Sequence, residues 1–406
     1  MAQLQQYKVI IVAPTCFYYQ VELFRELAIN PRIDLLVYFC SDEGITGADT
    51  QIAYGPNDDL GMDTQLLAGY QSRFLQNHAP NGSYLRSLIG LANLGVWKQL
   101  IQDRPDVVII MSWMNPTWWL IIFACIKHRI PMMFMTDANF HSERLKKPWK
   151  SWLKRKLLGN LIFSHISGFL CAGTANQQLY THFGVPPERL FPFAYSWGYK
   201  KFLAESNKLK NQKIELRKQY GLPQDAIIIL YCGRLSSEKG TIDLLRAFEK
   251  VPNRRKALVF VGNGPLRETL NKIVAEYKLD SVYFMGYQNR TDLGKFYTLA
   301  DLLVLPSLKE TWGMVVNEAL CFSLPIIASD QVGAGIDLVT SERNGYIFPA
   351  GDVTALADRI SKVLNLTYED WLEMRNNSRR AIEGWVNRDI AKLLVKHIDT
   401  LHSAHA

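Results

Sequence analysis

Short apolar runs rich in β-branched residues alternate along the chain with amphipathic stretches that have the period of a helix. In the first half the runs lie at residues 8–12, 34–39, 106–111, 131–136 and 168–172. In the second half they lie at residues 226–231, 256–261, 282–285, 301–305, 325–329 and 345–348. This alternation is typical of βαβ units, in which helices bury both faces of a parallel sheet.

A polar, lysine-rich stretch, residues 200–218, separates the two series and is interpreted as a linker with a helical lead-in. The predicted fold class is therefore α/β, with two doubly wound Rossmann-like domains facing across a cleft. The first domain spans residues 1–198 and the second residues 199–385, and a C-terminal helix at about 386–406 is expected to pack back on the first. Ligands of open α/β sheets bind at the carboxyl ends of the strands, so the site is expected in the cleft.

Composition narrows the class of protein and of partner. The 406 residues are 48% apolar and 21% charged, which suits large cores and excludes a disordered chain. An excess of 46 Lys and Arg over 38 Asp and Glu favours anionic partners such as nucleotides, nucleic acid or acidic lipid. The six cysteines have no metal or redox spacing and no secretory signal precedes the first strand, so we predict buried thiols and a cytoplasmic location.

Residues 107–126 raise the question of a membrane-spanning helix, because they carry no charge and are long enough to span a bilayer. The segment begins as a β-branched run and breaks at Asn115-Pro116 before a second apolar run. We therefore predict a buried strand, a loop and a short helix.

The first chemical signal lies in residues 231–240, where a buried run ends at Gly233 and a loop carries Arg234 and Lys239 before a helix that starts near Thr241. This combination suits a diphosphate, because glycine lets the ligand come close to the backbone, the two cations neutralise its charge, and the helix N-terminus offers free amides. The alternative is a solvated turn.

The second signal is a pair of carboxylates, Glu310 and Glu318, separated by seven residues. Glu310 follows the apolar run 301–305, and Gly313 precedes what reads as the first turn of a helix. One carboxylate and a row of free amides would suit the hydroxyls of a sugar, and the other carboxylate a ribose. The alternative is one surface Glu and one helix-interior Glu.

Together these segments resemble the C-terminal domain of the family-4 retaining glycosyltransferases of the two-Rossmann (GT-B) type. The resemblance rests on Gly233-Arg234 with Lys239-Gly240, on residues 261–266, and on Glu310-x7-Glu318, in this order. It is specific over about 226–351 and continues more weakly through residues 171–176, Tyr180, residues 183–186 and residues 191–195. The resemblance implies that Arg234 and Lys239 hold the donor diphosphate and that Glu318 holds the ribose. It implies that the donor sugar is held by Glu310 and by the amides of Gly313, Met314 and Val315. It also implies a nucleotide pocket lined by Gly262, Asn263, Gly264, Met285, Gly286 and Tyr287.

The implied activity is transfer of a hexosyl group, with retention, from a UDP- or GDP-sugar to a glycan, a lipid-linked acceptor or a lipid. Cations and a helix N-terminus can stabilise the departing diphosphate, and the chain contains no Asp-x-Asp, so neither a metal nor a cofactor is expected. In this mechanism the leaving phosphate takes the acceptor proton on the same face of the sugar. No protein nucleophile is then required.

The first domain departs from the family pattern at residues 14–20, which are bulky and aromatic where many members have paired glycines. These rings either stack on a sugar or pack. Asp137 and His141 follow another strand end and are the candidates for polarising or moving a proton; the alternative is a structural or solvated role.

Residues 144–161 combine seven Lys or Arg, all before residue 157, with an apolar stripe at Trp149, Trp152, Leu153, Leu157 and Leu161. A helix from Pro148 with this pattern suits an anionic membrane surface, which would make the protein peripheral on the inner face of the membrane. The alternative is a helix packed by its stripe with a solvated basic face. No nucleic-acid partner is expected, since no nucleic-acid motif accompanies the basic residues.

Two other function classes compete with the transferase. A nicotinamide-dependent oxidoreductase on two Rossmann domains needs Gly-x-Gly-x-x-Gly after its first strand, and Ala13-Pro14-Thr15 offers no such loop. A non-catalytic sugar-nucleotide-binding scaffold would be favoured if Arg234, Lys239 or Glu310 were missing, and all three are present.

Overall fold

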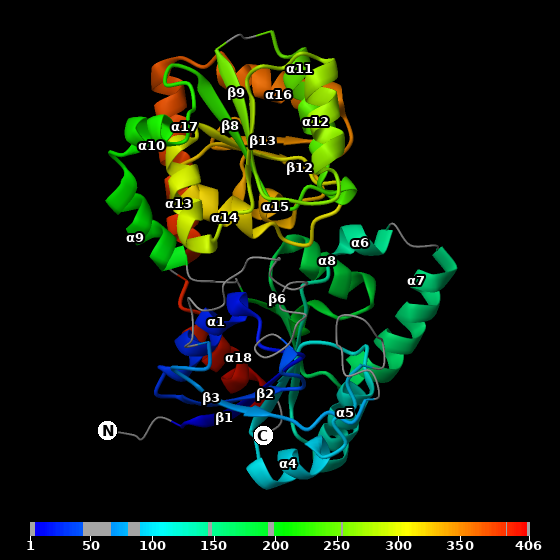
Figure 1. Ribbon diagram of the computed structural model, residues 1–406. Coiled ribbons are helices and arrows are strands. Elements are labelled where there is room, and N and C mark those ends of the chain that lie inside the picture. Colours follow the sequence, from blue (N-terminus) through cyan, green and yellow to red (C-terminus); the bar gives the residue numbers. More distant parts are fainter. Residues whose placement is uncertain are drawn as a thin grey trace. The chain divides into compact units, whose positions relative to one another are not determined.

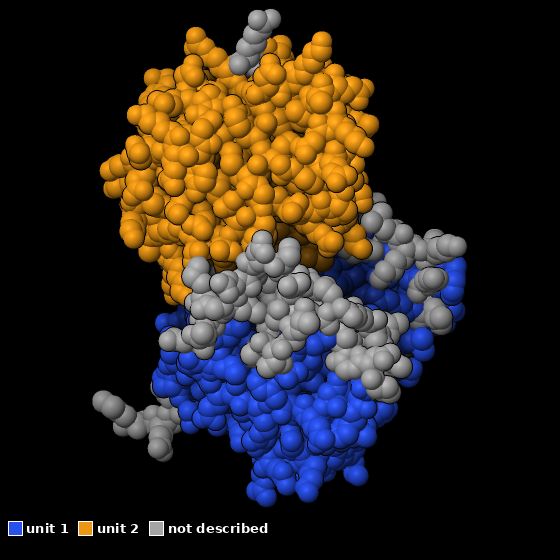
Figure 2. Space-filling model, viewed as in Figure 1, with its two compact units in different colours: residues 1–198, 388–406 blue, residues 199–387 orange. Residues whose placement is uncertain are grey.

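The computed structural model describes residues 5–43, 66–79, 90–144, 148–193, 199–252, 255–386 and 388–403. The chain divides into two compact units. The first unit comprises Met1–Gly198 with Arg388–Ala406, and the second comprises Tyr199–Asn387 (Figure 2). Each unit has its own sheet and its own apolar core.

The first unit is built on a seven-stranded sheet of order β3-β2-β1-β4-β5-β6-β7, in which all neighbours are parallel. The five apolar runs predicted as strands are β1 (Tyr7–Ala13), β2 (Ile33–Phe39), β4 (Val107–Ile110), β5 (Met132–Met135) and β6 (Gly168–Cys171). The two edge strands, β3 (Gln71–Phe74) and β7 (Leu190–Pro192), were not predicted, because β3 is largely polar and β7 has only three residues and ends in a proline.

Helices cover the first sheet in the order α1 (Tyr18–Ala28), α4 (Val96–Asp103), α5 (Pro116–His128), α6 (Phe140–Arg144), α7 (Pro148–Lys154) and α8 (Thr174–His182). A π-helix, Arg155–Ile162, continues α7 directly, and short 3-10 turns lie at Phe163–His165 and Pro187–Arg189. The strand, loop and helix predicted for residues 107–126 are confirmed as β4 and α5. Among the helices that the structure describes, none is long and apolar enough to cross a membrane.

The C-terminal helix α18 (Ile390–Ser403) packs on the first unit. Asp399 accepts hydrogen bonds from Tyr7 (2.6 Å) and from both terminal nitrogens of Arg32 (3.0 and 2.8 Å). These bonds join the last helix to the first strand and to the turn before β2. Residues 387 and 404–406 of the predicted terminal helix lie outside the described residues.

The second unit has a six-stranded parallel sheet of order β10-β9-β8-β11-β12-β13. Its strands are β8 (Ile227–Cys232), β9 (Lys256–Val261), β10 (Val282–Gly286), β11 (Leu302–Leu305), β12 (Ile326–Ser329) and β13 (Gly345–Phe348), and each corresponds to a predicted run. The predicted fold class, two doubly wound Rossmann-like α/β units, is therefore confirmed.

Helices flank both faces of this second sheet. In Figure 1, α11 (Thr241–Lys250), α12 (Arg267–Glu276) and α16 (Val353–Leu364) lie on one side of the sheet. On the other side lie α13 (Arg290–Leu299), α14 (Met314–Cys321) and α17 (Tyr368–Val386), with α15 (Gly333–Leu338) beside α14.

The lysine-rich stretch 200–218 is not a linker, and this interpretation is corrected. It forms α9 (Tyr199–Leu209) and α10 (Lys213–Gln219), which pack on α13. The buried Arg217 donates to the carboxylate of Asp301 (2.5 Å) and to the carbonyl of Leu299 (2.9 Å). Polar composition concealed this packing, because the residues that attach α10 to the sheet are charged.

Candidate functional site

The strand order of the second unit locates its ligand-binding edge. The order runs outward in one direction through β9 and β10 and in the other through β11, β12 and β13, so the reversal lies between β8 and β11. Loops at the carboxyl ends of two such strands diverge and leave room for a ligand. The loop after β8 carries Arg234 and Lys239, and the loop after β11 carries Glu310. The two chemical signals of the sequence therefore lie on neighbouring strands.

A direct contact joins these two loops. Lys239 Nζ donates to Glu310 Oε2 at 2.6 Å, and Ser307 Oγ donates to the same oxygen at 3.4 Å. The two charged side chains are 24% and 14% exposed, so each is largely buried but retains access to solvent. Backbone bonds reinforce the contact, since the carbonyl of Glu238 accepts from the amides of Leu308 (2.8 Å) and Lys309 (3.1 Å).

Arg234 is the first cation in the loop after β8, and its side chain is exposed. Its charge and that of Lys239 both act on Glu238, which lies between them in the sequence. The pKa of Glu238 is held below its ordinary value mainly by the hydroxyl of Ser236, which donates at 2.6 Å, and further by the two cations. The loop therefore carries two cations, and both neighbouring acids, Glu238 and Glu310, already accept hydrogen bonds.

The loop after β9 lies directly against the loop after β8. A Cβ on Gly262 would lie 2.0 Å from the carbonyl oxygen of Gly233, and the φ of Gly262 is +129°, so only glycine fits there. The amide of Leu235 donates to the carbonyl of Asn263 (2.9 Å), and the amide of Gly262 donates to the carbonyl of Gly286 (2.7 Å). The predicted nucleotide-lining segments, 262–264 and 285–287, are thus joined to the loop of Arg234 by backbone bonds.

The helix after Glu310 begins where the sequence predicted. Gly313 has φ +91° and precedes α14, so the amides of Gly313, Met314 and Val315 form the N-terminal turn. A Cβ at Gly313 would meet Val332 Cγ1 at 2.9 Å. The free amides of a helix N-terminus are a site for oxygen acceptors and negative charge.

Glu318 lies further along α14 and is 5% exposed. Its Oε2 accepts the hydroxyl hydrogen of Tyr297 at 2.7 Å, a partner that the sequence analysis did not identify. The pKa of Tyr297 is raised well above its ordinary value by burial and by the neighbouring Cys232 and Glu318, so the phenol remains a donor. The assignment of Glu318 to a ribose remains a prediction.

Trp312, between Glu310 and Gly313, was also missed. Its indole nitrogen donates to Asn317 Oδ1 (2.9 Å), and its ring stacks on Trp385 of α17 with centroids 5.4 Å apart. Asn317 is fully buried beside Glu318. The signal in the sequence was a tryptophan inside the loop that joins the carboxylate to the helix.

In the first unit, Asp137 and His141 lie between β5 and the first turn of α6. Asp137 is exposed and His141 is half-buried. Asn176 of α8 shapes the loop: its amide donates to the carbonyls of Thr136 (3.1 Å) and Ala138 (2.7 Å), and its oxygen accepts from the amide of Ala172 (3.0 Å). In the sequence, Asn176 is only one residue of the weakly resembling segment 171–176.

The aromatic loop after β1 has its own packing. Phe17 and Tyr19 stack on each other, with centroids 5.2 Å apart, and both are half-buried. Cys16 is buried, with its sulfur 3.8 Å from the hydroxyl of Tyr70. The two rings therefore already have a partner in each other.

The comparisons with known proteins concern the family and the fold. Residues 212–383, nearly all of the second unit, match the model of the family described as glycosyl transferases group 1. The second unit carries a group 1 glycosyl transferase domain. The resemblance predicted from the loops after β8, β9 and β11 is therefore confirmed at the level of group 1.

Relatives match over part of their length. The chain is 33% identical over 163 residues to an uncharacterized glycosyltransferase of Methanocaldococcus jannaschii, covering 39% of this chain and 40% of the relative. It is 27% identical over 224 residues to the N-acetyl-alpha-D-glucosaminyl L-malate synthase of Bacillus anthracis, covering 55% and 56%. The chain thus spans about half the length of the curated relatives it matches.

A solved structure extends the likeness to both units. The crystal structure of HepE from Anabaena, in complex with UDP and glucose, has a TM-score of 0.68 and 18% identity over 98% of this chain and 100% of that chain. At this identity the likeness concerns the fold. It supports a two-Rossmann (GT-B) fold for the two units.

Proposed function

We propose that this protein is a retaining glycosyltransferase of family 4, which moves a hexosyl group from a nucleotide-diphosphate sugar to a glycan, lipid-linked or lipid acceptor. The observation that carries the proposal is the contact of Lys239 with Glu310, at 2.6 Å, across the switch point of the second sheet. It brings a cation suited to a diphosphate next to a carboxylate suited to sugar hydroxyls. A UDP-sugar is the first donor to test, because HepE, with the same fold, was crystallised with UDP and glucose.

The second unit supplies groups for the departing charge. When the bond between the anomeric carbon and the diphosphate breaks, negative charge grows on the phosphate oxygen. Arg234 and Lys239 and the amides that begin α14 stabilise that charge without a metal. Glu310 accepts hydrogen bonds from sugar hydroxyls and so orients the reacting carbon.

Retention requires that the acceptor attack from the face that the diphosphate leaves. In the proposed step the acceptor oxygen bonds to the anomeric carbon, the bond from that carbon to the phosphate oxygen breaks, and the acceptor proton passes to the released phosphate. Asp137 and His141 of the first unit are proposed to polarise the acceptor or the sugar.

The six cysteines are buried free thiols, which supports a reducing compartment such as the cytoplasm.

The test is a panel of UDP-, GDP-, ADP- and dTDP-sugars, with and without divalent metal, read by thermal shift and then by nucleotide release. One stabilising donor with slow nucleotide release in the metal-free arm supports the transferase. The anomeric configuration of a product, read by NMR, then tests retention. Stabilisation without release, with acceptors of all three kinds supplied, would favour a sugar-nucleotide-binding scaffold instead.

A further inference from the structure

The helical segment 148–162 presents large apolar side chains to solvent. α7 begins at Pro148, as predicted, and passes into the π-helix at Arg155. Trp149 and Trp152 are 59% and 58% exposed, and Leu157 and Leu161 are 50% and 62% exposed. Residues 145–147 and the side chain of Leu153 lie outside the described residues. The described members of the predicted apolar stripe therefore do not pack the segment onto the first unit.

A different face of the segment packs inward, along Lys154, Leu158 and Ile162. Leu158 and Ile162 are 5% and 3% exposed. Lys154, which the sequence analysis counted among the basic residues of the segment, donates to the buried Glu143 (2.9 Å) and lies 5.1 Å from the ring centroid of Trp113. These three residues recur every four positions and so form one face, which is different from the predicted apolar stripe.

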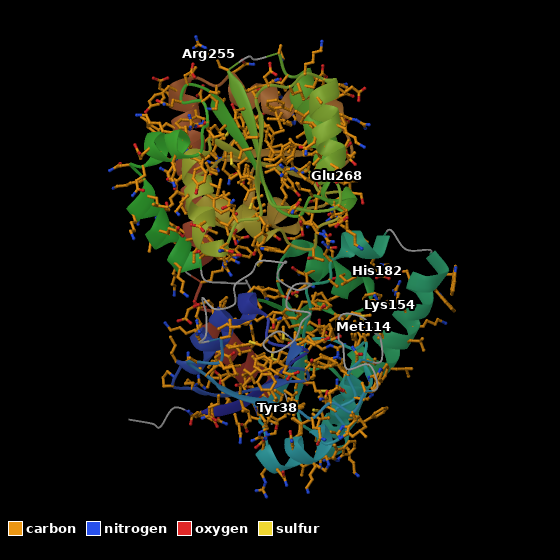
Figure 3. All side chains as sticks on the ribbon, viewed as in Figure 1. Tyr38, Met114, Lys154, His182, Arg255 and Glu268 are labelled. Atoms are coloured by element: carbon orange, nitrogen blue, oxygen red, sulfur yellow. The ribbon has the colours of Figure 1, made fainter. Side chains whose placement is uncertain are left out.

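A second exposed apolar face lies on α5. Trp119, Phe123 and Ile126, at i, i+4 and i+7, are 40%, 56% and 38% exposed. The loop that begins α5 contributes both Trp113, which contacts Lys154, and Met114, which is 55% exposed. Figure 3 shows Met114 and Lys154 in the same part of the first unit. The two exposed faces thus belong to neighbouring elements.

Positive charge accompanies both faces. Arg155 and Lys156 are exposed on the π-helix, and Lys127 and Arg129 are exposed at the end of α5. The ammonium of Lys156 lies 4.8 Å from the ring centroid of Trp152. Tryptophan with lysine or arginine beside it is the combination that favours the headgroup layer of an anionic bilayer, where the ring meets the acyl boundary and the cation meets phosphate.

We propose that the exposed faces of α5, α7 and the π-helix dock the first unit on an anionic membrane surface. The adjacent cations favour an anionic membrane over an apolar protein groove as the partner, because the cations need negative charge beside the apolar surface. The inference does not depend on the proposed reaction, since binding to lipid can be measured without a donor or an acceptor.

The test is co-sedimentation of the full chain with vesicles of phosphatidylcholine alone and of phosphatidylcholine mixed with phosphatidylglycerol. The wild type is expected to sediment with the anionic vesicles. Trp149→Ser with Trp152→Ser is expected to release it, and the control, Tyr368→Ser with Leu372→Ser, removes exposed apolar groups from the second unit (69% and 42% exposed) and is expected to leave binding unchanged.

A double substitution of two cations keeps the proposal testable if the tryptophan variant does not fold. Arg155→Ser with Lys156→Ser should weaken binding to anionic vesicles about 30-fold, from roughly 1 kcal/mol for each cation near the surface. The matched control removes the exposed Lys210 and Lys272 of the second unit. Wild-type binding by both test variants would overturn the proposal. So would a dimer in sedimentation velocity that the tryptophan substitutions dissociate, because the face would then be occupied by a second copy.

Discussion

Lys239 and Glu310 neutralise each other across 2.6 Å before any ligand arrives, so each sets the charge that the other presents. A diphosphate would compete with Glu310 for the ammonium, and the freed carboxylate would be available to sugar hydroxyls. Both side chains are mostly shielded from solvent, which makes their interaction stronger than that of a surface pair. Substitutions at the two positions should therefore have different signatures.

Replacing the cation should act on the chemical step. Lys239→Ala removes a positive charge from the departing diphosphate, and we expect kcat/KM for nucleotide release to fall by a factor of about 10² to 10³, or about 3 to 4 kcal/mol of transition-state stabilisation. Lys250→Ala, on the exposed end of α11, is the matched control and should retain full activity. Turnover of Lys239→Ala within about twofold of wild type, under 0.5 kcal/mol, would remove the residue from the diphosphate site.

Replacing the carboxylate should change the affinity for the nucleotide sugar and the affinity for the nucleotide alone differently. Glu310→Gln leaves Lys239 without its anionic partner, so a nucleoside diphosphate alone is expected to bind at least as tightly as to wild type. The complete nucleotide sugar should bind about tenfold more weakly, because a charged hydrogen bond to its hydroxyls is lost. Isothermal titration with both ligands measures the difference. Parallel weakening of both affinities would contradict a role specific to the sugar.

The residue types at this site followed from the sequence, but their partners did not. Arg234, Lys239 and Glu310 were identified because glycines, strand ends and a helix start surround them. The ion pair of Lys239, the phenol of Tyr297 on Glu318 and the indole of Trp312 on Asn317 depend on contacts between different loops and helices. Such contacts need the strand order, which the sequence pattern alone did not supply.

At the scale of elements, α18 is attached to the first unit in part by a buried histidine. His397 is 7% exposed, its ring stacks on Phe191 with centroids 4.5 Å apart, and its Nε2 lies 3.4 Å from the carbonyl oxygen of Pro192. Burial lowers the pKa of His397, the hydrogen bond to the Pro192 carbonyl opposes this, and the charge of Lys396 lowers it further. The net direction is downward, so the ring is neutral in the folded protein at neutral pH.

The sign of the resulting pH dependence follows from proton binding. Below the ordinary histidine pKa of about 6.5 the unfolded chain binds a proton that folded His397 does not, so stability falls as pH decreases through that value. It levels off below the lowered pKa of the folded state. We expect the drop in Tm between neutral and mildly acidic pH to be smaller in His397→Gln than in wild type. The exposed His165→Gln is the control, and an equal drop in wild type and His397→Gln would contradict the assignment.

Prediction of the strands followed the apolar runs and not the degree of burial, since β10 was predicted although its residues are only half-buried. Strands such as β8 and β11 are apolar throughout, since both faces of a parallel sheet are covered. β3 has mostly exposed residues and therefore has no apolar run. The π-helix from Arg155 was missed for another reason, because the local pattern does not show its tertiary contacts. It buries Leu158 and Ile162, and a Cβ at Gly159 would lie 2.5 Å from the carbonyl oxygen of Phe183.

At the scale of the whole molecule, the first unit is discontinuous in sequence and the second is continuous. The first needs residues from both ends of the chain, because α18 bonds to Tyr7 and Arg32 through Asp399. The second has its own sheet, its own core and every residue assigned to the donor, from Arg234 to Glu318. We therefore expect donor recognition to be separable from the rest of the chain, whereas the proposed transfer also needs the proposed roles of Asp137 and His141 of the first unit.

This division predicts the behaviour of residues 199–387 expressed alone. The fragment should unfold cooperatively and bind a nucleoside diphosphate within about tenfold of the full chain, a difference of about 1.4 kcal/mol, because no contact assigned to the nucleotide lies outside it. It should release no nucleotide from the donor in the presence of acceptor. Lys239→Ala in the fragment controls for nonspecific binding. A folded fragment with no affinity, beside a full chain that binds, would show that residues of the first unit complete the donor site.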